Sequence, residues 1–261
     1  MNIKNLLNFS GTYKLYERYL TKQIQKQPKP QHIGIILDGN RRWAQDSNKP
    51  RWFGHYKGAE TANNLMTWCQ DLDIKIITLY VLSAENYNRK KEELNELFNL
   101  IYEKLDILIK DERIHNNKIR VKALGNRKIL PEKIIKILDN IEKQTENYSD
   151  NYLNIAIAYG GRNEIVNAIK KITEDIKLEK INTEQISENL IEKYLYTSHL
   201  PKQEPELVIR TSGEERLSGF LLWQSAYSEL VFLDVYWPDF RKIDLMRAIR
   251  TYQKRSRRLG E

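Results

Sequence analysis

The sequence contains a single cysteine, Cys69, among 261 residues. One cysteine excludes an internal disulfide framework and any metal site built from several cysteines. The chain also lacks a run of about 18 consecutive apolar residues, the minimum for a membrane-spanning helix. Its first 26 residues mix charged and apolar side chains, so they do not form the uninterrupted apolar segment of a secretory signal. These absences predict a reduced intracellular compartment, the cytoplasm.

Glycine and proline are also scarce, with 11 and 7 residues, which excludes collagen-like and low-complexity chains. The hydrophobic fraction is 41% and the charged fraction 30%, as in soluble globular proteins. A chain of this length forms one large or two small domains and can bury a full core. The net charge of +8 leaves three kinds of partner open: nucleic acid, an anionic membrane surface or a phosphorylated small substrate.

The N-terminal segment has the periodicity of an amphipathic helix, because apolar residues recur every three or four positions from Leu6 to Ile24. Pro28 and Pro30 then form a short stiff linker. We therefore expect an N-terminal helical extension over residues 1–27 and a main domain over residues 28–261. The apolar face of the extension is expected to pack on the domain or on a partner subunit. Contact with a membrane surface is the alternative.

After the linker, short β-rich runs alternate with amphipathic helical patterns. Strands are predicted over Ile33–Leu37, Ile76–Leu82, Ile119–Leu124, Leu153–Ala158, Leu207–Arg210 and Leu230–Leu233. Helices are predicted over Lys57–Leu72, Lys91–Asp111, Pro131–Asn147, Arg162–Lys177, Thr183–Leu195 and Lys242–Arg258. This alternation predicts a single α/β domain with a central, mostly parallel six-stranded sheet flanked by helices.

Ligands of such sheets bind beyond the carboxyl ends of the strands, so the residues that follow each strand are the first candidates. The first strand runs into Asp38, Gly39 and Asn40, where a helix begins. A carboxylate followed by glycine and helix amides suits a hard metal ion beside a phosphate. A helix N-cap made by Asp38 or Asn40 is an equally good explanation of this spacing.

Basic residues follow in the same segment. Arg41 and Arg42 are adjacent, and Arg51 and His55 lie further along. Guanidinium groups clustered near a glycine turn fit a diphosphate pocket, because each can bind phosphate oxygens in bidentate fashion. A solvated basic loop is the alternative.

Two more strand ends carry polar clusters. The second strand ends in Ser83–Arg89, which packing and helix capping do not fully explain. The fifth strand opens into a glycine-containing turn bracketed by Arg210 and Arg216, which predicts a second anion site. Glu229 follows among apolar neighbours, where a carboxylate needs a partner. That partner is either a basic side chain in a structural salt bridge or a metal ion.

The sequence contains neither a GxxxxGK[ST] loop nor a GxGxxG motif, which disfavours P-loop nucleotidases and dinucleotide-binding enzymes. The residues alone therefore predict a metal-assisted enzyme that acts on two phosphorylated ligands.

Four motifs then resemble one family. These are His32–Ala44 (HIGIILDGNRRWA), Ser83–Asn86 (SAEN), Tyr159–Arg162 (YGGR) and Arg210–Glu214 (RTSGE) followed by Glu229. They resemble the cis-prenyltransferases, also called undecaprenyl or Z-isoprenyl diphosphate synthases, in order from His32 to Arg258. The resemblance implies a hydrophobic tunnel and a Mg²⁺-assisted head-to-tail condensation. In that reaction an allylic diphosphate loses pyrophosphate, isopentenyl diphosphate attacks the allylic carbon, and proton loss leaves a cis double bond.

The resemblance also implies roles for individual residues. Asp38 positions Mg²⁺ and is catalytic, and Asn86 is catalytic as the proton acceptor. Because a neutral amide is a poor base, we expect Asn86 to relay the proton to pyrophosphate or water. The allylic diphosphate is held by Gly39, Asn40, Arg41, Arg42, Trp43, Arg51 and His55, with a second wall of Ser83, Ala84, Glu85, Tyr87 and Arg89. Isopentenyl diphosphate is held by Arg210, Arg216, Leu217 and Ser218, and Glu229 is a second metal ligand, reached across a homodimer.

Several residues differ from those that are frequent in bacterial members, and these differences bear on which allylic diphosphate is the starter. Arg41 replaces a frequent glycine, Ala84 a serine, Tyr87 a tryptophan and Gly219 an asparagine. The Arg41-Arg42-Trp43 sequence and the Arg210–Glu214 loop are more similar to archaeal or eukaryotic-type members, which favours geranylgeranyl diphosphate as the starter. The bacterial likeness would favour farnesyl diphosphate. Either way the expected product is a long-chain polyprenyl diphosphate that serves as a glycosyl carrier lipid.

Two other readings remain. A non-catalytic partner subunit is disfavoured because Asp38, Arg42 and Arg210 are all kept. A nucleic-acid-binding protein would be supported by the basic tail from Arg250 to Arg258, but basic residues at a helix end also stabilise the helix dipole. We therefore expect no nucleic-acid partner. The two terminal helices leave peripheral contact with the inner face of the membrane open as an alternative.

Overall fold

The computed structural model describes residues 12–88 and 90–255. It contains one six-stranded sheet in the order β3-β4-β2-β1-β5-β6. Its strands are β1 (His32–Ile36), β2 (Ile76–Ser83), β3 (Ile119–Leu124), β4 (Asn151–Tyr159), β5 (Leu207–Arg210) and β6 (Glu229–Phe232). Every neighbouring pair is parallel, so the predicted α/β fold is confirmed and the sheet is more uniform than expected.

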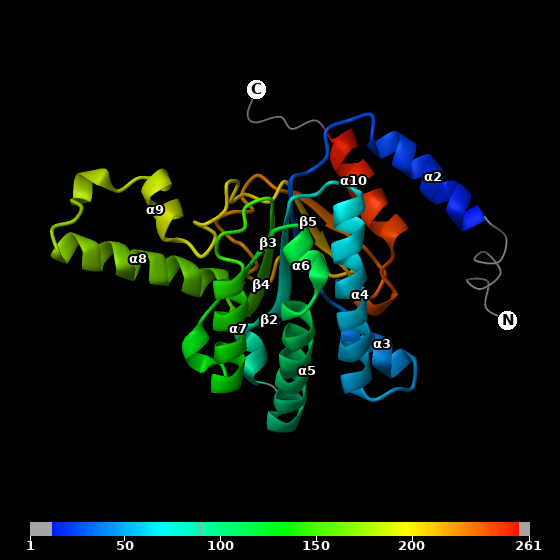
Figure 1. Cartoon of the computed structure of the whole chain (residues 1–261), viewed down its shortest axis with the longest axis horizontal. Coiled ribbons are helices and arrows are strands. Elements are labelled where there is room, and N and C mark those ends of the chain that lie inside the picture. The colour runs from blue at the N-terminus through cyan, green and yellow to red at the C-terminus, as the bar shows by residue number, and fades with distance from the viewer. Residues whose placement is uncertain (1–11, 89, 256–261) are drawn as a thin grey trace.

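Helices connect the strands (Figure 1). They are α2 (Thr12–Ile24), α3 (Asn40–Asp46), α4 (Arg51–Asp71), α5 (Lys91–Ile109), α6 (Glu112–Asn116), α7 (Glu132–Gln144), α8 (Gly161–Lys177), α9 (Glu188–Tyr194) and α10 (Lys242–Lys254). Helix α4 begins at Arg51, six residues before the predicted start at Lys57. The prediction missed these residues because the first turns of α4 carry polar and aromatic side chains without an apolar repeat. The helix predicted over Thr183–Leu195 is interrupted, since the Ser187 hydroxyl accepts from the Leu190 amide and starts α9 there.

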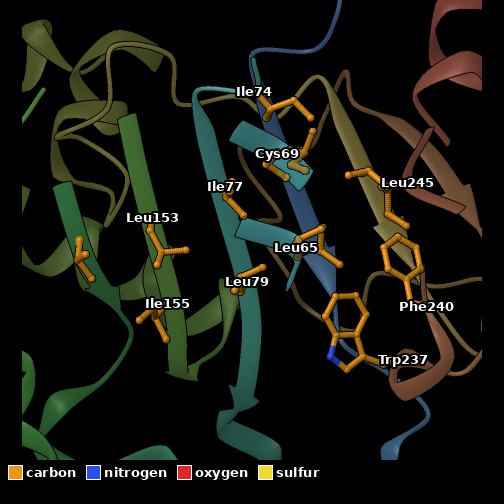
Figure 2. Packing of buried hydrophobic residues seen from close by; sticks show 14 of the residues in the cluster. Leu65, Cys69, Ile74, Ile77, Leu79, Leu153, Ile155, Trp237, Phe240 and Leu245 are labelled. Atoms are coloured by element: carbon orange, nitrogen blue, oxygen red, sulfur yellow. The ribbon is translucent and has the colours of Figure 1, made fainter. Parts of the chain in front are cut away.

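One face of the sheet carries the main core. Ile77 and Leu79 of β2 point toward Leu65 and Cys69 of α4, with Trp237 nearby (Figure 2). Helices α5, α7 and α10 contribute further buried residues to the same cluster. Burial raises the pKa of the Cys69 thiol, which is a packing residue here rather than a nucleophile.

The opposite face carries a chain of buried polar side chains. Asn154 Nδ2 donates to Thr78 Oγ1 over 2.9 Å, and Thr78 Oγ1 lies 2.8 Å from His32 Nε2. Asn154 Oδ1 in turn lies 2.9 Å from His199 Nε2. Burial lowers the pKa of His32 to about 3 and that of His199 to about 4. Both imidazoles are therefore neutral at pH 7.

Helix α2 lies along α10 (Figure 1). Leu20 and Ile24 are fully buried, and Arg247 Nε donates to Tyr16 Oη over 3.3 Å. Gln253 closes the contact by donating to the Ile24 carbonyl over 3.0 Å. The helix thus packs on the domain, which was the first of the two expectations. The predicted positions Leu6 and Phe9, and the tail from residue 256 onward, lie outside the described residues.

Within the described ranges, no helix is both long and apolar enough to cross a bilayer. Helices α8 and α9 form a separate arm that stands away from the sheet on the side opposite α2 (Figure 1). The buried carboxylate of Glu164 holds the base of this arm, because it accepts from Tyr159 Oη over 2.5 Å and from the Tyr196 amide over 2.8 Å. Burial raises the pKa of Glu164.

Candidate active site

A left-handed turn at Gly39 places the first candidate residues. Gly39 has φ = 103°, and a Cβ there would lie 2.8 Å from Tyr236 Cδ1. Only glycine adopts this conformation without strain, so the turn depends on it. The Gly39 amide donates to Asp38 Oδ1 over 2.7 Å, which fixes the carboxylate at the end of β1.

Asp38 and Arg210 form the centre of the site. Arg210 Nη2 donates to Asp38 Oδ2 over 2.8 Å, across the adjacent ends of β1 and β5. The other end of the Arg210 guanidinium donates to Ser218 Oγ over 2.8 Å and to the Arg216 carbonyl. This almost fully buried arginine therefore brings the two predicted anion sites next to each other.

The loop after β5 holds a second arginine. Ser212 has φ = 76°, a strained conformation for a residue other than glycine, and its hydroxyl accepts from Arg42 Nη2 over 2.5 Å. Arg42 also pairs with Glu214 at 3.4 Å and lies 3.9 Å from Asp38 Oδ2. Strain at such a position is typical of functional loops.

Helix α3 reaches the site because α4 packs very closely against it. A Cβ at Gly58 would lie 2.1 Å from Asn40 Oδ1, so only glycine permits this approach. The Gly58 carbonyl also accepts from Trp237 Nε1 over 2.8 Å. The close contact places Arg41 of α3 and Arg51 of α4 on the same side of the cavity, and both contact Glu93 of α5.

A cavity of about 960 Å³ opens at the carboxyl edge of the sheet, where these elements meet. Most of the predicted residues line it: Asp38, Gly39, Asn40, Arg41, Arg42, Arg51, His55, Ser83, Glu85, Asn86, Arg210 and Ser218. They come from the ends of β1, β2 and β5, where the rule for parallel sheets expects a ligand, and from helices α3 and α4, which follow β1.

Five further predicted residues, Trp43, Ala84, Tyr87, Arg216 and Leu217, are not among those that line this cavity. Trp43 stacks on Phe53, and Leu217 packs against the buried cluster around Tyr80. Arg216 is exposed and pairs with Glu214, while Ala84 begins the turn that follows β2.

The fifth, Tyr87, packs on Phe98 with ring centroids 5.7 Å apart, and burial raises its pKa to about 12. Arg89 lies outside the described residues.

The cavity also has lining residues that were not assigned to it from the sequence. They are Gln45, Tyr80, Gly160, Gly161, Arg162, Asn163, Gly219 and Leu222, with Val81 and Leu82 at the end of β2. Gly160 to Arg162 belong to the YGGR motif at the end of β4, and Asn163 follows it, so the strand-end rule would have found them. Arg162 adds another guanidinium, carried by the first turn of α8.

Glu229 does not meet Asp38 within one chain. It starts β6 and pairs with Leu207, while Phe232 pairs with Arg210 at the other end of the same strands. Three residues of strand separate the two edges by about 10 Å. Within the chain, Glu229 Oε2 accepts from Arg255 Nη1 over 2.9 Å, so the salt bridge is formed and an intramolecular metal pair is not.

A second cavity of about 500 Å³ continues from the first between α4 and α5. Both are lined by Leu37, Asn40, His55, Val81 and Leu97. Its deeper wall is mostly apolar and includes Ala62, Met66 and Ile101. One continuous space is therefore rich in guanidinium groups at one end and in hydrocarbon at the other.

No cluster of three or more metal-ligating side chains occurs among residues 12–88 and 90–255. Asp38 is nevertheless a suitable partial ligand, because Mg²⁺ is commonly held by one or two carboxylates together with substrate phosphates and water. The residues present fit a metal ion that arrives with a diphosphate.

The comparisons with known proteins agree with this geometry. The family model described as putative undecaprenyl diphosphate synthase matches residues 36–260. Tritrans,polycis-undecaprenyl-diphosphate synthases described as geranylgeranyl-diphosphate specific are among the relatives. The Methanopyrus kandleri protein is 50% identical, over 97% of this chain and 93% of that relative. The Thermoplasma acidophilum protein is 47% identical over 100% of both chains.

Two solved structures share the fold. Lavandulyl diphosphate synthase from Lavandula x intermedia, in complex with dimethylallyl diphosphate, matches with a TM-score of 0.86 and 32% identity, over 89% of this chain and 99% of that chain. A probable undecaprenyl diphosphate synthase from Campylobacter jejuni matches with a TM-score of 0.72 and 29% identity, over 90% of this chain and 100% of the other. The resemblance seen in the motifs is thus confirmed, and the chain belongs to the undecaprenyl diphosphate synthase family, the cis-prenyltransferases.

Proposed function

We propose that the chain extends an allylic diphosphate by repeated head-to-tail cis-condensation with isopentenyl diphosphate, releasing pyrophosphate at each step. The continuity of the arginine-lined and apolar cavities is the observation that carries this proposal. An allylic diphosphate has a highly charged head and a hydrocarbon tail, and this space matches both. The M. kandleri relative, described as geranylgeranyl-diphosphate specific, supports geranylgeranyl diphosphate as the starter.

The chemistry develops negative charge on the departing pyrophosphate. Arg41, Arg42 and Arg51 are placed to stabilise that charge, and fixed donors do so better in the transition state than in the ground state. Bound Mg²⁺, positioned by Asp38, would supply further charge neutralisation. Arg210 and Ser218 would hold the diphosphate of isopentenyl diphosphate. Asn86 would relay the proton lost from that substrate toward pyrophosphate or water.

The direct test incubates the purified chain with Mg²⁺, radiolabelled isopentenyl diphosphate and each allylic starter in turn, and sizes the products. We expect a ladder in five-carbon steps with geranylgeranyl diphosphate and a weaker ladder with farnesyl diphosphate. No incorporation with either starter would refute the proposed function.

We also propose that the chain works as a homodimer. The arm carries exposed apolar side chains, Val166 and Ile169 on α8 and Leu178 and Ile186 beyond it, and Tyr227 is 69% exposed. A second copy of the chain would cover this surface. It would also allow Glu229 to reach the Asp38 of its partner after leaving Arg255.

A mixing experiment separates this arrangement from a site within one chain. Asp38→Ala and Glu229→Gln should each lose nearly all activity. After the two are dissociated and reassembled together, half of the dimers are mixed and each mixed dimer keeps one intact site. About a quarter of wild-type activity should therefore return if the site is shared across a symmetric dimer. No recovery, with mixed dimers present, would exclude a shared site.

We further propose that residues 28–261 form the catalytic domain and that the helical extension mediates peripheral membrane contact at the inner face of the membrane. Leu15 and Tyr19 of α2 are exposed beside Lys14, Arg18 and Lys22. Such a surface suits anionic headgroups. Transfer of a long-chain product, the proposed glycosyl carrier lipid, from the protein into water is unfavourable, because each CH₂ group that leaves an apolar environment costs about 0.8 kcal/mol of free energy.

Detergent or vesicles should therefore raise the steady-state rate while leaving the single-turnover rate of condensation nearly unchanged. Leu15→Ser with Tyr19→Ser should reduce the effect of vesicles but not that of detergent. An equal rise in the steady-state and single-turnover rates would show that product release is not the rate-limiting step.

A further inference from the structure

The carboxylate of Glu93 lies between two arginines of the cavity. Its Oε1 is 3.4 Å from Arg41 Nε, and its Oε2 is 3.5 Å from Arg51 Nη1. The Glu93 side chain is only 13% exposed, whereas those of Arg41 and Arg51 are 42% and 59% exposed. For neither guanidinium is another ionic partner found among residues 12–88 and 90–255. Glu93 is therefore the principal counter-charge to this pair.

The contact is loose enough to leave both arginines usable. Each guanidinium has five N–H donors in a planar fork, and the contacts with Glu93 run through Nε of Arg41 and Nη1 of Arg51. Both distances exceed those of a strong charge-assisted hydrogen bond, about 2.7–2.9 Å. The remaining donors can meet phosphate oxygens in the cavity that both residues line.

A carboxylate at this position also opposes the binding of an anion. A diphosphate held by Arg41 and Arg51 would lie within a few ångströms of Glu93, and two negative charges that share one basic site repel each other. Most positioning groups strengthen ligand binding, but the electrostatic effect of this one has the opposite sign. An enzyme that must release pyrophosphate after every condensation gains from such an effect, because very tight binding of the leaving group would slow each cycle.

We propose that Glu93 is a positioning residue that lowers the affinity of the allylic diphosphate site for pyrophosphate and so speeds its release in each cycle. The inference rests on the proposed function, which makes pyrophosphate a product of this cavity. Glu93 lies in the first turn of α5, one turn before Leu97, which lines both cavities. Release of pyrophosphate and the return of the arginines to Glu93 thus take place beside the helix that walls the apolar cavity.

The test measures binding of inorganic pyrophosphate with Mg²⁺ by titration calorimetry, without any turnover. Glu93→Gln removes the charge but keeps the shape, and it should bind pyrophosphate about threefold or more tightly than wild type, as expected for a partly screened charge. Glu96→Gln removes an equal charge one turn along the same helix, at an exposed position, and should stay within twofold of wild type. Glu93→Asp keeps the charge and should also stay near wild type.

Kinetics supply a second readout. Glu93→Gln should show stronger product inhibition by pyrophosphate and a lower steady-state rate, while its single-turnover rate of condensation is not reduced. Unchanged or weaker pyrophosphate binding in Glu93→Gln, relative to Glu96→Gln, would overturn the inference and leave the proposed function intact. Absence of pyrophosphate binding in the wild-type protein would overturn both.

Discussion

The two cavities share a wall but differ in almost every physical property. The outer one is built from strand ends and loops, contains strained backbone and brings together Asp38, Arg42 and Arg210. The inner one is built from the regular helices α4 and α5 and is lined mainly by hydrocarbon. Charged groups fixed at strand ends can stabilise the diphosphate that leaves when the allylic C–O bond breaks. An apolar wall can accommodate a hydrocarbon chain that moves along it as the product grows. Under the proposed function, we expect the outer cavity to determine the rate of condensation and the inner cavity to determine the length of the product.

The largest expected effect is in the outer cavity, at Asp38. Asp38→Ala removes the carboxylate beside Arg210 and should raise the barrier to condensation by at least about 2.7–4 kcal/mol, the scale of one lost electrostatic contact. Asp38→Asn should lose nearly as much, because the shape is kept and the charge is not. Single-turnover rates measure both, and binding of the allylic substrate should weaken far less. Near-normal turnover in Asp38→Ala would contradict the assignment.

The next effect divides the outer cavity into two diphosphate sites. Arg51→Ala should raise the KM for the allylic substrate about tenfold, equal to one lost interaction of about 1.4 kcal/mol. Arg210→Ala should act mainly on the KM for isopentenyl diphosphate, because Arg210 also holds Ser218. Arg216→Ala should act in the same direction but less, since its side chain is exposed and paired with Glu214. The division would be wrong if initial-rate kinetics showed that Arg51→Ala raises mainly the KM for isopentenyl diphosphate and Arg210→Ala mainly the KM for the allylic substrate.

A smaller effect on rate, with a clear effect on product, is expected in the inner cavity. Ala62→Phe fills part of the apolar space, and Met66→Ala enlarges it. The first variant should shorten the longest product and the second should lengthen it, while the rate of the first condensation stays within about threefold of wild type, since overpacking costs of 1–3 kcal/mol fall mainly on stability. Sized products and rapid-quench rates measure the two quantities. A block of the first condensation by Ala62→Phe would mean that the cavities are not separate in function.

The smallest effect on activity, with an effect on stability instead, is expected at His32 and His199, on the face of the sheet away from the main core. Folding lowers both pKa values, to about 3 and about 4, so between pH 4 and pH 6.5 the unfolded chain binds protons that the folded chain does not. Stability therefore falls as the pH is lowered through this window, by up to about 1.4 kcal/mol per pH unit for each histidine. Glu206 and Lys202 lie near His32, and Arg120 and Lys122 near His199.

Replacement of one histidine measures its share. His199→Gln can keep the hydrogen bond to Asn154 but cannot titrate, so its free energy of unfolding should depend less steeply on pH than that of wild type. Denaturant titrations at pH 7, 6 and 5 give the slopes, and activity at pH 7 should not change. Equal slopes in the two proteins would contradict the buried neutral state of His199.

The sequence predicted those parts of the site whose signal is local. Asp38, Glu85 and Arg210 lie at or just beyond the carboxyl ends of buried strands, so the parallel-sheet rule found them without any knowledge of packing. Arg162 follows β4 in the same way and was available to that rule. Glu93 was not, because a glutamate in the first turn of a helix looks like an ordinary solvated or capping residue. Its role depends on how closely α3, α4 and α5 approach one another, which Gly58 permits but the spacing of residues does not show.

Glu229 is a second residue whose surroundings the sequence predicted only in part. Its apolar neighbours correctly indicated that it needs a partner, but only the strand register shows that Asp38 lies at the opposite edge of the sheet. The start of α4 was missed because its first turns face the cavity, where the apolar repeat is lost.

The most direct test of the account locates both ends of one bound substrate. A geranylgeranyl diphosphate analogue with a photoreactive group at the tail would be irradiated on the enzyme, and the labelled peptides identified by mass spectrometry. We predict adducts on α4 and α5 at the inner cavity, including the segment from Ala62 to Met66, and their loss when unmodified geranylgeranyl diphosphate is added in excess. Adducts on α8, α9 or α2 that resist competition would contradict the claim that the two cavities hold one substrate.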